Sequence, residues 1–395
     1  MSIATVVKSL AFGSTLGLIA AAPAALAQET IKLGLTVPMS GAAALWGKGS
    51  DFLCKKAAQE IAAAGGAKVG GKTYNFECLS YDNKYNAAEG TRVAQTLLNR
   101  DGVKYIGGSI GTAPVQALQS LSERQGVVLF TTAWGTSVKG PKFPLTFTQI
   151  NTPIELLPPL SKFVSGKHPN AKTVLLFNPN DATGRDTAVV ADKAWKDVGV
   201  KVVGSDFYER GTTEFQPTAA RIASLNPDII DVGPTPPADA GALLRELEVL
   251  GWKGVKVMPV GSGIDALQAT AGRAAEGVYM GAAIPFEGPS VFDHQKKVNE
   301  EARAVLGESI NAIQIGSYDA VYAIKAGIEK AQSIDPREVA KVLPDLTFRT
   351  FYGGEIGFGG MKDYGSKQQM QLPVVITQVQ DGKLVELSRI PASGN

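Results

Sequence analysis

The sequence predicts an α/β protein with two lobes, each built around a parallel sheet that helices cover on both faces. Short apolar, strand-like segments alternate with helix-like segments along almost the whole chain of 395 residues. The alternation runs through two cycles, and a sequence rich in Pro, Gly and Thr separates them over residues 135–153. After residue 260 the pattern changes, as expected for a tail that returns to both lobes.

The first cycle consists of short apolar strands with helical stretches between them. Its predicted strands span 31–38, 74–81, 103–106 and 127–130, and its predicted helices span 44–64, 87–99 and 114–124. The second cycle repeats this pattern. Its predicted strands span 173–177, 200–208, 228–232 and 255–260, and its predicted helices span 185–198, 217–225 and 238–250.

The tail begins with a predicted strand over 277–281 and predicted helices over 291–306 and 313–331. Short strands and hairpins follow from Thr347, where Asp381-Gly382 is a turn signal. A tail that is shared by both lobes indicates that the chain crosses between them several times. We therefore predict a hinge between the lobes and not a flexible tether.

The first 27 residues have the features of a secretory signal peptide. Lys8 is their only charge, an apolar run follows over residues 10–22, and Ala25-Leu26-Ala27 fits a signal-peptidase site. A membrane anchor is the alternative, but the apolar core of about a dozen residues is shorter than the roughly 20 needed to cross a bilayer. We expect export, with the mature chain beginning near Gln28.

Length and charge limit the functions that the chain could have. The 368 residues that follow the signal peptide suit two domains of ordinary size. After cleavage, 38 basic residues face 37 acidic ones. A chain so balanced lacks the basic surface that nucleic acid or an anionic membrane requires, so neither is an expected partner. No later segment is long and apolar enough to span a membrane.

Cys54 and Cys78 are the two cysteines, the first on a predicted helix and the second on the following strand. In an oxidising compartment such a pair can form a disulfide, and a loop of about 25 residues would add roughly 3 kcal/mol of stability. The alternative is two buried thiols that pack as small apolar groups. We predict the disulfide.

Ligands of open parallel sheets bind beyond the carboxyl ends of the strands. The loops at these ends are therefore the expected site. In this sequence they are residues 39–41, 82–83, 107–113, 131–136, 178–184, 233–237 and 261–265.

Several of these loops carry a family resemblance. Residues 36–41 read Thr-Val-Pro-Met-Ser-Gly, with Trp46-Gly47 just after them. Further similar segments occur in the same order at 61–66, 81–83, 107–109 and 180–184. Together they resemble the branched-chain amino-acid (Leu/Ile/Val-binding) type of periplasmic solute-binding protein, over nearly all of the mature chain.

The resemblance implies a type I periplasmic-binding fold, with two Rossmann-like lobes joined by a hinge of three strands. The signal peptide would span 1–27. Lobe 1 would comprise 28–150 plus 282–366, and lobe 2 would comprise 151–281 plus 367–395. The resemblance further implies a periplasmic monomer that captures a small ligand by hinge closure and delivers it to an ABC permease and ATPase.

Amino-acid binders of this type hold the ligand carboxylate with two lobe-1 loops, and the first corresponds to Gly111-Thr112 here. Thr112 supplies a hydroxyl near the start of a predicted helix, where free N–H groups and the helix dipole favour an anion. The alternative is that Thr112 is only a helix N-cap.

The second loop corresponds to residues 132–136. Ala133 matches the small residue that offers its backbone, Gly135 stands where these binders usually have Thr, and Trp134 is larger than expected. Trp46 matches an aromatic that often flanks the apolar part of the ligand. A buried Trp is otherwise more often part of the core.

Lobe 2 is expected to contribute Thr183, Thr235 or the adjacent Pro236, and Ser262. Here the sequence departs from the family pattern, because amino-acid binders place a carboxylate near Gly261 to hold the ligand ammonium. Neither of two nearby acids, Asp265 and Glu287, aligns with that position.

A buried ammonium without a counter-charge costs several kcal/mol, so the departure bears on the ligand. Our hypothesis is a carboxylate without an α-amine, either an aromatic or a short aliphatic acid. A branched-chain amino acid is the alternative ligand.

An esterase is the competing hypothesis. Residues 107–111 match the G-x-S-x-G elbow around Ser109, and Asp265 and His294 follow in the hydrolase order. However, His294 begins a polar helix, and the other histidine, His168, lies in a polar turn. The motif also arises wherever a strand-to-helix turn needs small residues, so we expect a binding protein and no enzyme.

A soluble ligand sensor of the same fold is a further alternative to transport. We expect no cofactor and no metal, because the sequence has no paired histidines, P-loop or dinucleotide motif.

Overall fold

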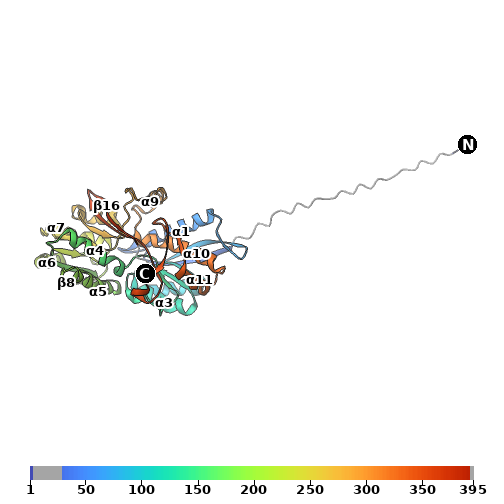
Figure 1. Ribbon diagram of the computed structural model, residues 1–395, viewed down its shortest axis with the longest axis horizontal. Coiled ribbons are helices and arrows are strands. Elements are labelled where there is room, and N and C mark those ends of the chain that lie inside the picture. The colour runs from blue at the N-terminus through green and yellow to red at the C-terminus, as the bar shows by residue number, and fades with distance from the viewer. Residues whose placement is uncertain (3–28, 392–395) are drawn as a thin grey trace.

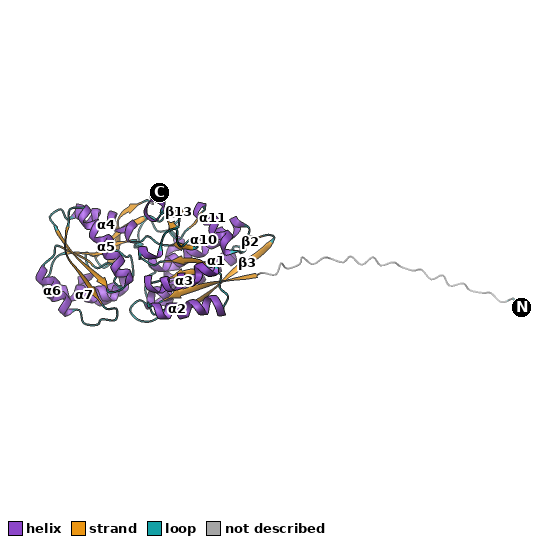
Figure 2. Ribbon diagram, turned by 90° about the horizontal axis from the view of Figure 1, so that it is seen from below, coloured by secondary structure: helices purple, strands orange, loops and turns teal. Residues whose placement is uncertain are grey.

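The computed structural model describes residues 1–2 and 29–391. The signal peptide predicted over 1–27 therefore lies outside the described residues, apart from its first two. The described chain forms two α/β lobes that lie side by side (Figures 1 and 2). None of the helices in this part of the chain is long and apolar enough to cross a membrane.

The first lobe contains a nine-stranded sheet in the order β12-β13-β14-β6-β5-β4-β1-β3-β2. The strands are β1 (Glu29–Val37), β2 (Ala67–Val69), β3 (Lys72–Asp82), β4 (Tyr105–Ser109), β5 (Val128–Thr131), β6 (Thr146–Thr148), β12 (Thr347–Arg349), β13 (Glu355–Gly359) and β14 (Gln369–Met370). The helices of this lobe are α1 (Ala44–Ala63), α2 (Ala87–Gln95) with η1 (Thr96–Arg100), α3 (Thr112–Gln125), η2 (Thr136–Val138), α9 (Asp293–Leu306), α10 (Ala312–Ala331), α11 (Pro336–Val342), η4 (Leu343–Asp345) and α12 (Met361–Tyr364).

The second lobe contains a seven-stranded sheet in the order β16-β15-β11-β10-β9-β7-β8. The strands are β7 (Thr173–Pro179), β8 (Lys201–Tyr208), β9 (Ile229–Asp231), β10 (Val255–Met258), β11 (Tyr279–Gly281), β15 (Val374–Gln380) and β16 (Lys383–Ile390). The helices are α4 (Pro153–Lys167), α5 (Ala182–Asp197), α6 (Gln216–Leu225), α7 (Pro237–Val249), α8 (Ile264–Ala271) and η3 (Gly272–Ala275).

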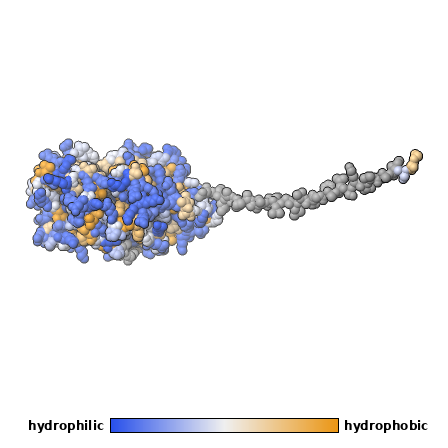
Figure 3. Space-filling model, turned by 90° about the horizontal axis from the view of Figure 1, so that it is seen from above, coloured by the Kyte–Doolittle hydropathy of each residue, from blue (hydrophilic) through white to orange (hydrophobic). Residues whose placement is uncertain are grey.

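The central strands of both sheets run parallel, which confirms the predicted fold class. Among the strands of residues 29–391, antiparallel pairs occur only toward the sheet edges. Examples are β2 with β3 and β15 with β16. Strands β4 and β5 are buried at every position, as central parallel strands covered on both faces should be. Few large apolar side chains are exposed among the described residues, and the face in Figure 3 is mainly hydrophilic.

The chain passes between the two sheets three times. Residues 149–152 join β6 to α4, residues 282–292 join β11 to α9, and residues 371–373 join β14 to β15. Strand β14 pairs with β6 and β13, so the pairing of the first sheet extends to Met370. The two lobes are thus linked by three short, separate segments.

Strands β15 and β16 form the hairpin that the Asp381-Gly382 signal predicts. Both turn residues have positive φ, 49° at Asp381 and 74° at Gly382. Two consecutive left-handed residues are what a two-residue type I′ turn requires, and this turn matches the twist of the paired strands.

Cys54 and Cys78 form a disulfide that connects α1 to β3, with their Cα atoms 6.2 Å apart. Both side chains belong to the buried core of the first lobe. The bond fixes the first helix onto the sheet, and α1 also begins beside the cleft described below.

We predict that the C54A/C78A variant loses about 3 kcal/mol of unfolding free energy, because the bond closes a 24-residue separation in the unfolded chain. Urea unfolding followed by circular dichroism would measure the loss. The wild type in a thiol reductant is the control, since it keeps both sulfur atoms in the core. Equal unfolding midpoints in oxidised and reduced wild type would contradict the prediction.

Candidate ligand-binding site between the lobes

The carboxyl ends of the strands in the two sheets face each other, and the helices that follow these strands begin there. Helix α3 starts at Thr112 directly after β4, and α5 starts at Ala182 after β7. The Thr112 N–H donates to Thr183 Oγ1 over 3.2 Å, and the Thr183 hydroxyl donates to Thr112 Oγ1 over 2.9 Å. The first turns of the two helices therefore meet across the gap between the lobes.

Gly135 joins the same contact, because its N–H donates to Thr112 Oγ1 over 3.1 Å. A Cβ at Gly135 would lie 2.5 Å from Thr112 Cγ2 and 2.6 Å from Asp186 Oδ2, so this position has no room for a side chain. Gly111 is the N-cap of α3 with φ of 93°, so Thr112 is the first helical residue and not the N-cap. The structure thus brings four predicted site residues together.

Two more cross-lobe contacts show that the lobes are closed. Asp186 Oδ2 on α5 accepts from the Ser137 hydroxyl at 2.8 Å and from the Ser137 N–H at 3.3 Å. The Tyr85 hydroxyl lies 3.4 Å from Thr183 Oγ1, and the Arg210 guanidinium lies 4.0 Å from the centre of the Tyr85 ring. Polar contacts between the protein's own groups therefore hold this edge of the cleft shut.

Arg210 is a site residue that the sequence reasoning missed. It follows β8, and its Nε donates to Asp181 Oδ2 over 2.5 Å. Its two terminal nitrogens, Nη1 and Nη2, are shielded from solvent and have no hydrogen-bond partner. Asp181 also caps α5, since its Oδ1 accepts from the Gly184 N–H. One carboxylate thus positions both the helix end and the arginine.

Tyr85 is the second residue that was missed, although its loop was identified. Lys84 and Tyr85 both have positive φ, 46° and 57°, which is uncommon for residues other than glycine. The Asn83 side chain accepts from the Tyr85 N–H at 2.9 Å, and Asp82 accepts from the Lys84 N–H at 2.9 Å. These turns direct the ring to the cleft, and burial raises the pKa of the Tyr85 hydroxyl.

Trp46 lies in the first turn of α1 and is buried, with its ring centre 6.3 Å from that of Tyr85. The two rings are inclined by 55° to each other. Arg210, Tyr85 and Trp46 therefore follow one another along the cleft. The contact between Trp46 and Tyr85 places this tryptophan beside the cleft, as predicted for a residue that flanks a ligand.

Trp134 and Ala133 belong to the same loop as Gly135, residues 132–136, but their side chains do not join the contact with Thr112. Trp134 faces a cavity of about 10 Å³, roughly the space of one water molecule, and its Nε1 has no partner there. All three crossings contribute to the cavity, through Asn151, Ala282 and Leu372. Ala133 packs in the core beneath α3, and its N–H donates to Thr131 Oγ1 over 2.9 Å. These two residues are thus placed at the hinge and in the core.

Thr235 and Ser262 follow β9 and β10 and are fully buried. Ser262 Oγ has no hydrogen-bond partner, and Ser262 lines a cavity of about 1220 Å³ between α8, α9 and β16. The acids near this turn are engaged elsewhere. Asp265 accepts from Arg303 and the Ser309 N–H, and Glu287 pairs with Lys383 at the surface.

A third acid, Glu308, does lie beside this turn. A Cβ at Gly263 would be 3.4 Å from Glu308 Oε2, and the Glu308 side chain is only 3% exposed. Burial, with the charge of Asp265, raises the pKa of Glu308 to about 7. No local pattern indicates this proximity, because 45 residues and the second crossing separate Glu308 from Gly263.

The esterase residues are not brought together. The Ser109 hydroxyl donates to the Phe130 carbonyl oxygen at 3.0 Å. His294 Nε2 lies 2.9 Å from Glu60 Oε1, and Asp265 is bound to Arg303. No group of three potential metal ligands occurs in residues 1–2 and 29–391.

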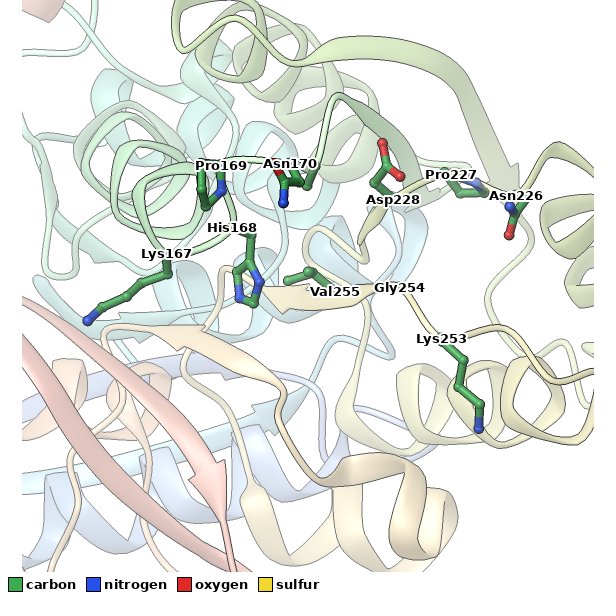
Figure 4. A pocket seen from close by; sticks show the side chains of 11 residues that line it. Lys167, His168, Pro169, Asn170, Asn226, Pro227, Asp228, Lys253, Gly254 and Val255 are labelled. Atoms are coloured by element: carbon green, nitrogen blue, oxygen red, sulfur yellow. The ribbon is translucent and has the colours of Figure 1, made fainter.

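A separate hollow of about 460 Å³ lies at the amino ends of the second sheet, opposite the cleft (Figure 4). His168 in its wall contacts the Tyr279 hydroxyl at 3.0 Å, and burial lowers the pKa of His168. Asp228 accepts three hydrogen bonds from Lys172 and Thr173. These side chains hold loops together, and the functional site is at the other end of the strands.

The strand ends of the two lobes face each other, and the closed cleft buries polar groups that have no partner within the protein. This arrangement is typical of a two-lobed ligand-binding protein. The family model for "Periplasmic binding protein" matches residues 30–383. The chain therefore belongs to this family of non-enzymatic binding proteins, which confirms the predicted resemblance.

Individual relatives give further comparisons. The chain is 27% identical over 214 residues to a leucine-, isoleucine-, valine-, threonine- and alanine-binding protein of Pseudomonas aeruginosa. This alignment covers 52% of the chain and 55% of the relative, so it spans about half the length of each.

Two solved structures share the fold over the whole of both lobes. A leucine-binding protein, LivK, of Thermotoga maritima has a TM-score of 0.77 at 20% identity, covering 91% of this chain and 99% of that one. An ABC-transporter solute-binding protein of Rhodopseudomonas palustris, in complex with 3,4-dihydroxybenzoic acid, has a TM-score of 0.77 at 22% identity, covering 92% and 98%.

We predict that Thr183→Val opens the unliganded protein. The substitution keeps the shape of the side chain but removes its hydrogen bonds to Thr112, each worth about 1 kcal/mol. The ratio of closed to open molecules should fall about 30-fold, and small-angle X-ray scattering would show a larger radius of gyration.

Thr187→Val is the matched control for this experiment. Thr187 lies one turn further along α5, is equally buried, and bonds only to the Thr183 carbonyl oxygen of its own helix. Equal radii of gyration for the two variants would contradict the prediction.

Proposed function

We propose that this protein captures a small carboxylate-bearing ligand between its lobes and presents it to the permease and ATPase of an ABC importer. The observation that carries the proposal is the pair of unpartnered, buried nitrogens of Arg210 at the cleft. The predicted signal peptide over 1–27 and the disulfide support a periplasmic location. We propose that the protein acts as a monomer.

A carboxylate is well matched to the terminal nitrogens of Arg210. The guanidinium presents parallel N–H donors whose spacing matches the two oxygens of a carboxylate. Asp181 pairs with Nε, but leaving the two terminal nitrogens buried without an acceptor is costly, so a ligand that accepts from both stabilises the closed form. The N-termini of α3 and α5 meet in the same region, and their dipoles add to the favourable potential for an anion.

Hinge closure follows from the three crossings. We propose that residues 29–150 with 282–370 move as one body, and residues 151–281 with 371–391 as the other, because β14 pairs with β6 and β13 of the first sheet. In the open form the contacts between Thr112 and Thr183 are broken and both loop sets are exposed to water. The ligand favours closure only by its higher affinity for the closed form. The permease would then recognise the closed shape.

The walls of the cleft support an aromatic or short aliphatic acid as the ligand. Trp46 and Tyr85 offer two aromatic faces next to Arg210. The names of the relatives indicate the same range, since one binds branched-chain and small amino acids and another holds 3,4-dihydroxybenzoic acid. A branched-chain amino acid also carries the carboxylate that Arg210 would bind.

We predict that Arg210→Gln weakens the binding of aromatic and aliphatic acids about 100-fold. Two charged hydrogen bonds are lost, each worth roughly 1.5–3 kcal/mol. Arg210→Lys should show an intermediate loss, because it keeps the charge but not the fork. A thermal-shift screen of carboxylic acids, their amides and amino acids would identify ligands, and isothermal titration calorimetry would then give the affinities.

Arg185→Gln is the control for this set, because Arg185 is an exposed arginine near the start of α5 and bonds to Asn180. It should bind the acids as the wild type does. If carboxamides bind as tightly as the carboxylates, or if Arg210→Gln leaves the affinity unchanged, the proposal is wrong.

A further inference from the structure

We infer that Lys139 is a positioning residue for ligand capture, which holds the first turn of helix α4 to the first lobe and so favours the closed arrangement of the two lobes. The inference rests on the hinge closure of the proposed function. It assigns control of the opening of the cleft to a residue at the hinge, and it is independent of which ligand binds in the cleft.

The first support is that all three N–H donors of the Lys139 ammonium are used at the hinge. Its Nζ donates to Thr152 Oγ1 over 2.7 Å, to Gln369 Oε1 over 2.7 Å and to the Tyr364 hydroxyl over 3.1 Å. Thr152 ends the first crossing and is the N-cap of α4, whereas Gln369 lies in β14, just before the third crossing. Gln369 also donates to the Ile150 carbonyl oxygen in the first crossing, over 2.6 Å. One ammonium group therefore ties together two of the crossings.

The second support is a carboxylate at the start of the second lobe that binds into the same cluster. Glu155 lies in the first turn of α4, and its Oε1 accepts from the Tyr364 hydroxyl over 2.6 Å. Its Oε2 accepts from the N–H and the hydroxyl of Thr152, over 2.8 and 2.7 Å. The Lys139 Nζ also lies 4.2 Å from the centre of the Tyr364 ring. Lys139 and Tyr364 of the first lobe thus hold the beginning of a second-lobe helix.

This cluster is shielded from water. Thr152 is fully buried and Gln369 is 2% exposed. Burial lowers the pKa of Lys139 to about 8, although the charges of Glu155 and Asp363 act to raise it. A desolvated ammonium depends on its acceptors and on the carboxylate nearby, so a movement that takes α4 away from Lys139 is costly.

Opening of the lobes is such a movement. Thr152 belongs to the crossing itself, whereas Glu155 lies almost one helical turn further on and moves with the second lobe. When the lobes separate, Glu155 moves away from Lys139 and Tyr364, and the first lobe keeps a cation that has lost its carboxylate. The cluster is complete in the closed form, so it favours closure.

The third support is that one short segment reaches from this cluster to the ligand cleft. Alternate residues of the segment 135–139 make the contacts. Gly135 bonds to the first turn of α3, Ser137 to α5 and Lys139 to the N-cap of α4. The loop that contributes to the cleft is therefore fixed at its other end by the hinge.

Amide hydrogen exchange of the ligand-free mature chain tests the inference. The Thr112 N–H bonds to Thr183 across the cleft, so its exchange reports the opening of the lobes even where the open form is rare. We expect Lys139→Met to speed Thr112 exchange about tenfold, because a buried carboxylate loses its cation. Lys142→Met is the control, since Lys142 is an exposed lysine three residues further along the same loop. It should leave Thr112 exchange unchanged.

Tyr364→Phe is the second variant, because Tyr364 lies outside this loop. It keeps the ring beside Lys139 and removes the hydrogen bond to Glu155, so Thr112 exchange should rise about fivefold. The double variant should show less than the product of the two effects, since both changes act on Glu155. This variant also decides the question if Lys139→Met does not fold.

The outcomes distinguish a hinge role from a purely structural one. If the amides of β4 and β5 exchange faster while Thr112 exchange is unchanged, Lys139 only stabilises the fold and the inference is overturned. If Lys139→Met speeds Thr112 exchange but Tyr364→Phe does not, the loop alone has loosened and the inference is again overturned. Because no ligand is present, the proposed function fails separately, in the thermal-shift screen, if no carboxylic acid binds.

Discussion

The contact between the first turns of α3 and α5 determines how this molecule can work. In each sheet the parallel strands and their following helices place every strand end and helix N-terminus at one edge. The two edges face each other, and Thr112 and Thr183 bond directly across them. The positive dipole ends of helices from both lobes are thereby concentrated in one place, which is a favourable environment for an anion.

The hydrogen bonds between the lobes also limit how much free energy a ligand must supply for closure. On closure four polar side chains exchange water for one another, namely those of Thr112, Thr183, Ser137 and Asp186. Neutral hydrogen bonds of this kind contribute little net free energy, because water served the same groups in the open form. On closure Arg210 gains the face of the Tyr85 ring, but its two terminal nitrogens and Ser262 Oγ gain no hydrogen-bond partner. Without a ligand, the hydrogen bonds gained in the closed form are offset by buried groups that have no partner. A ligand that supplies these partners therefore shifts the equilibrium between the open and closed forms strongly.

Strong periodicity and turn chemistry explain what was predictable. The buried central strands, the helices between them and the Asp381-Gly382 turn follow from local patterns, and so does the pairing of a helix cysteine with one on the next strand. Helix α4 does not, because Pro158 and Pro159 each remove a helix hydrogen bond. The fully buried Leu156, Leu157 and Leu160, together with the Thr152–Glu155 capping box, outweigh this loss.

Only part of the candidate site could be predicted, because some of its residues are placed by chain order and others by contacts between the lobes. Thr112, Gly135 and Thr183 stand at strand ends, where chain order alone locates them. Arg210 and Glu308 look like ordinary surface charges in the sequence, and they become buried only because residues from the opposite lobe cover them. Arg210 is covered by Tyr85, whose left-handed backbone is held by Asn83, and Glu308 meets the turn at Gly263. Local sequence cannot record a burial that arises between lobes.

The nearly neutral chain and its charged cleft are consistent with each other. A net charge of +2 over 395 residues creates no long-range field that would draw anions without discrimination. Selection therefore depends on close pairing inside the cleft, where the two terminal nitrogens of Arg210 lack hydrogen-bond partners. A desolvated guanidinium discriminates strongly, because a ligand without a matching acceptor leaves these nitrogens buried and unpaired.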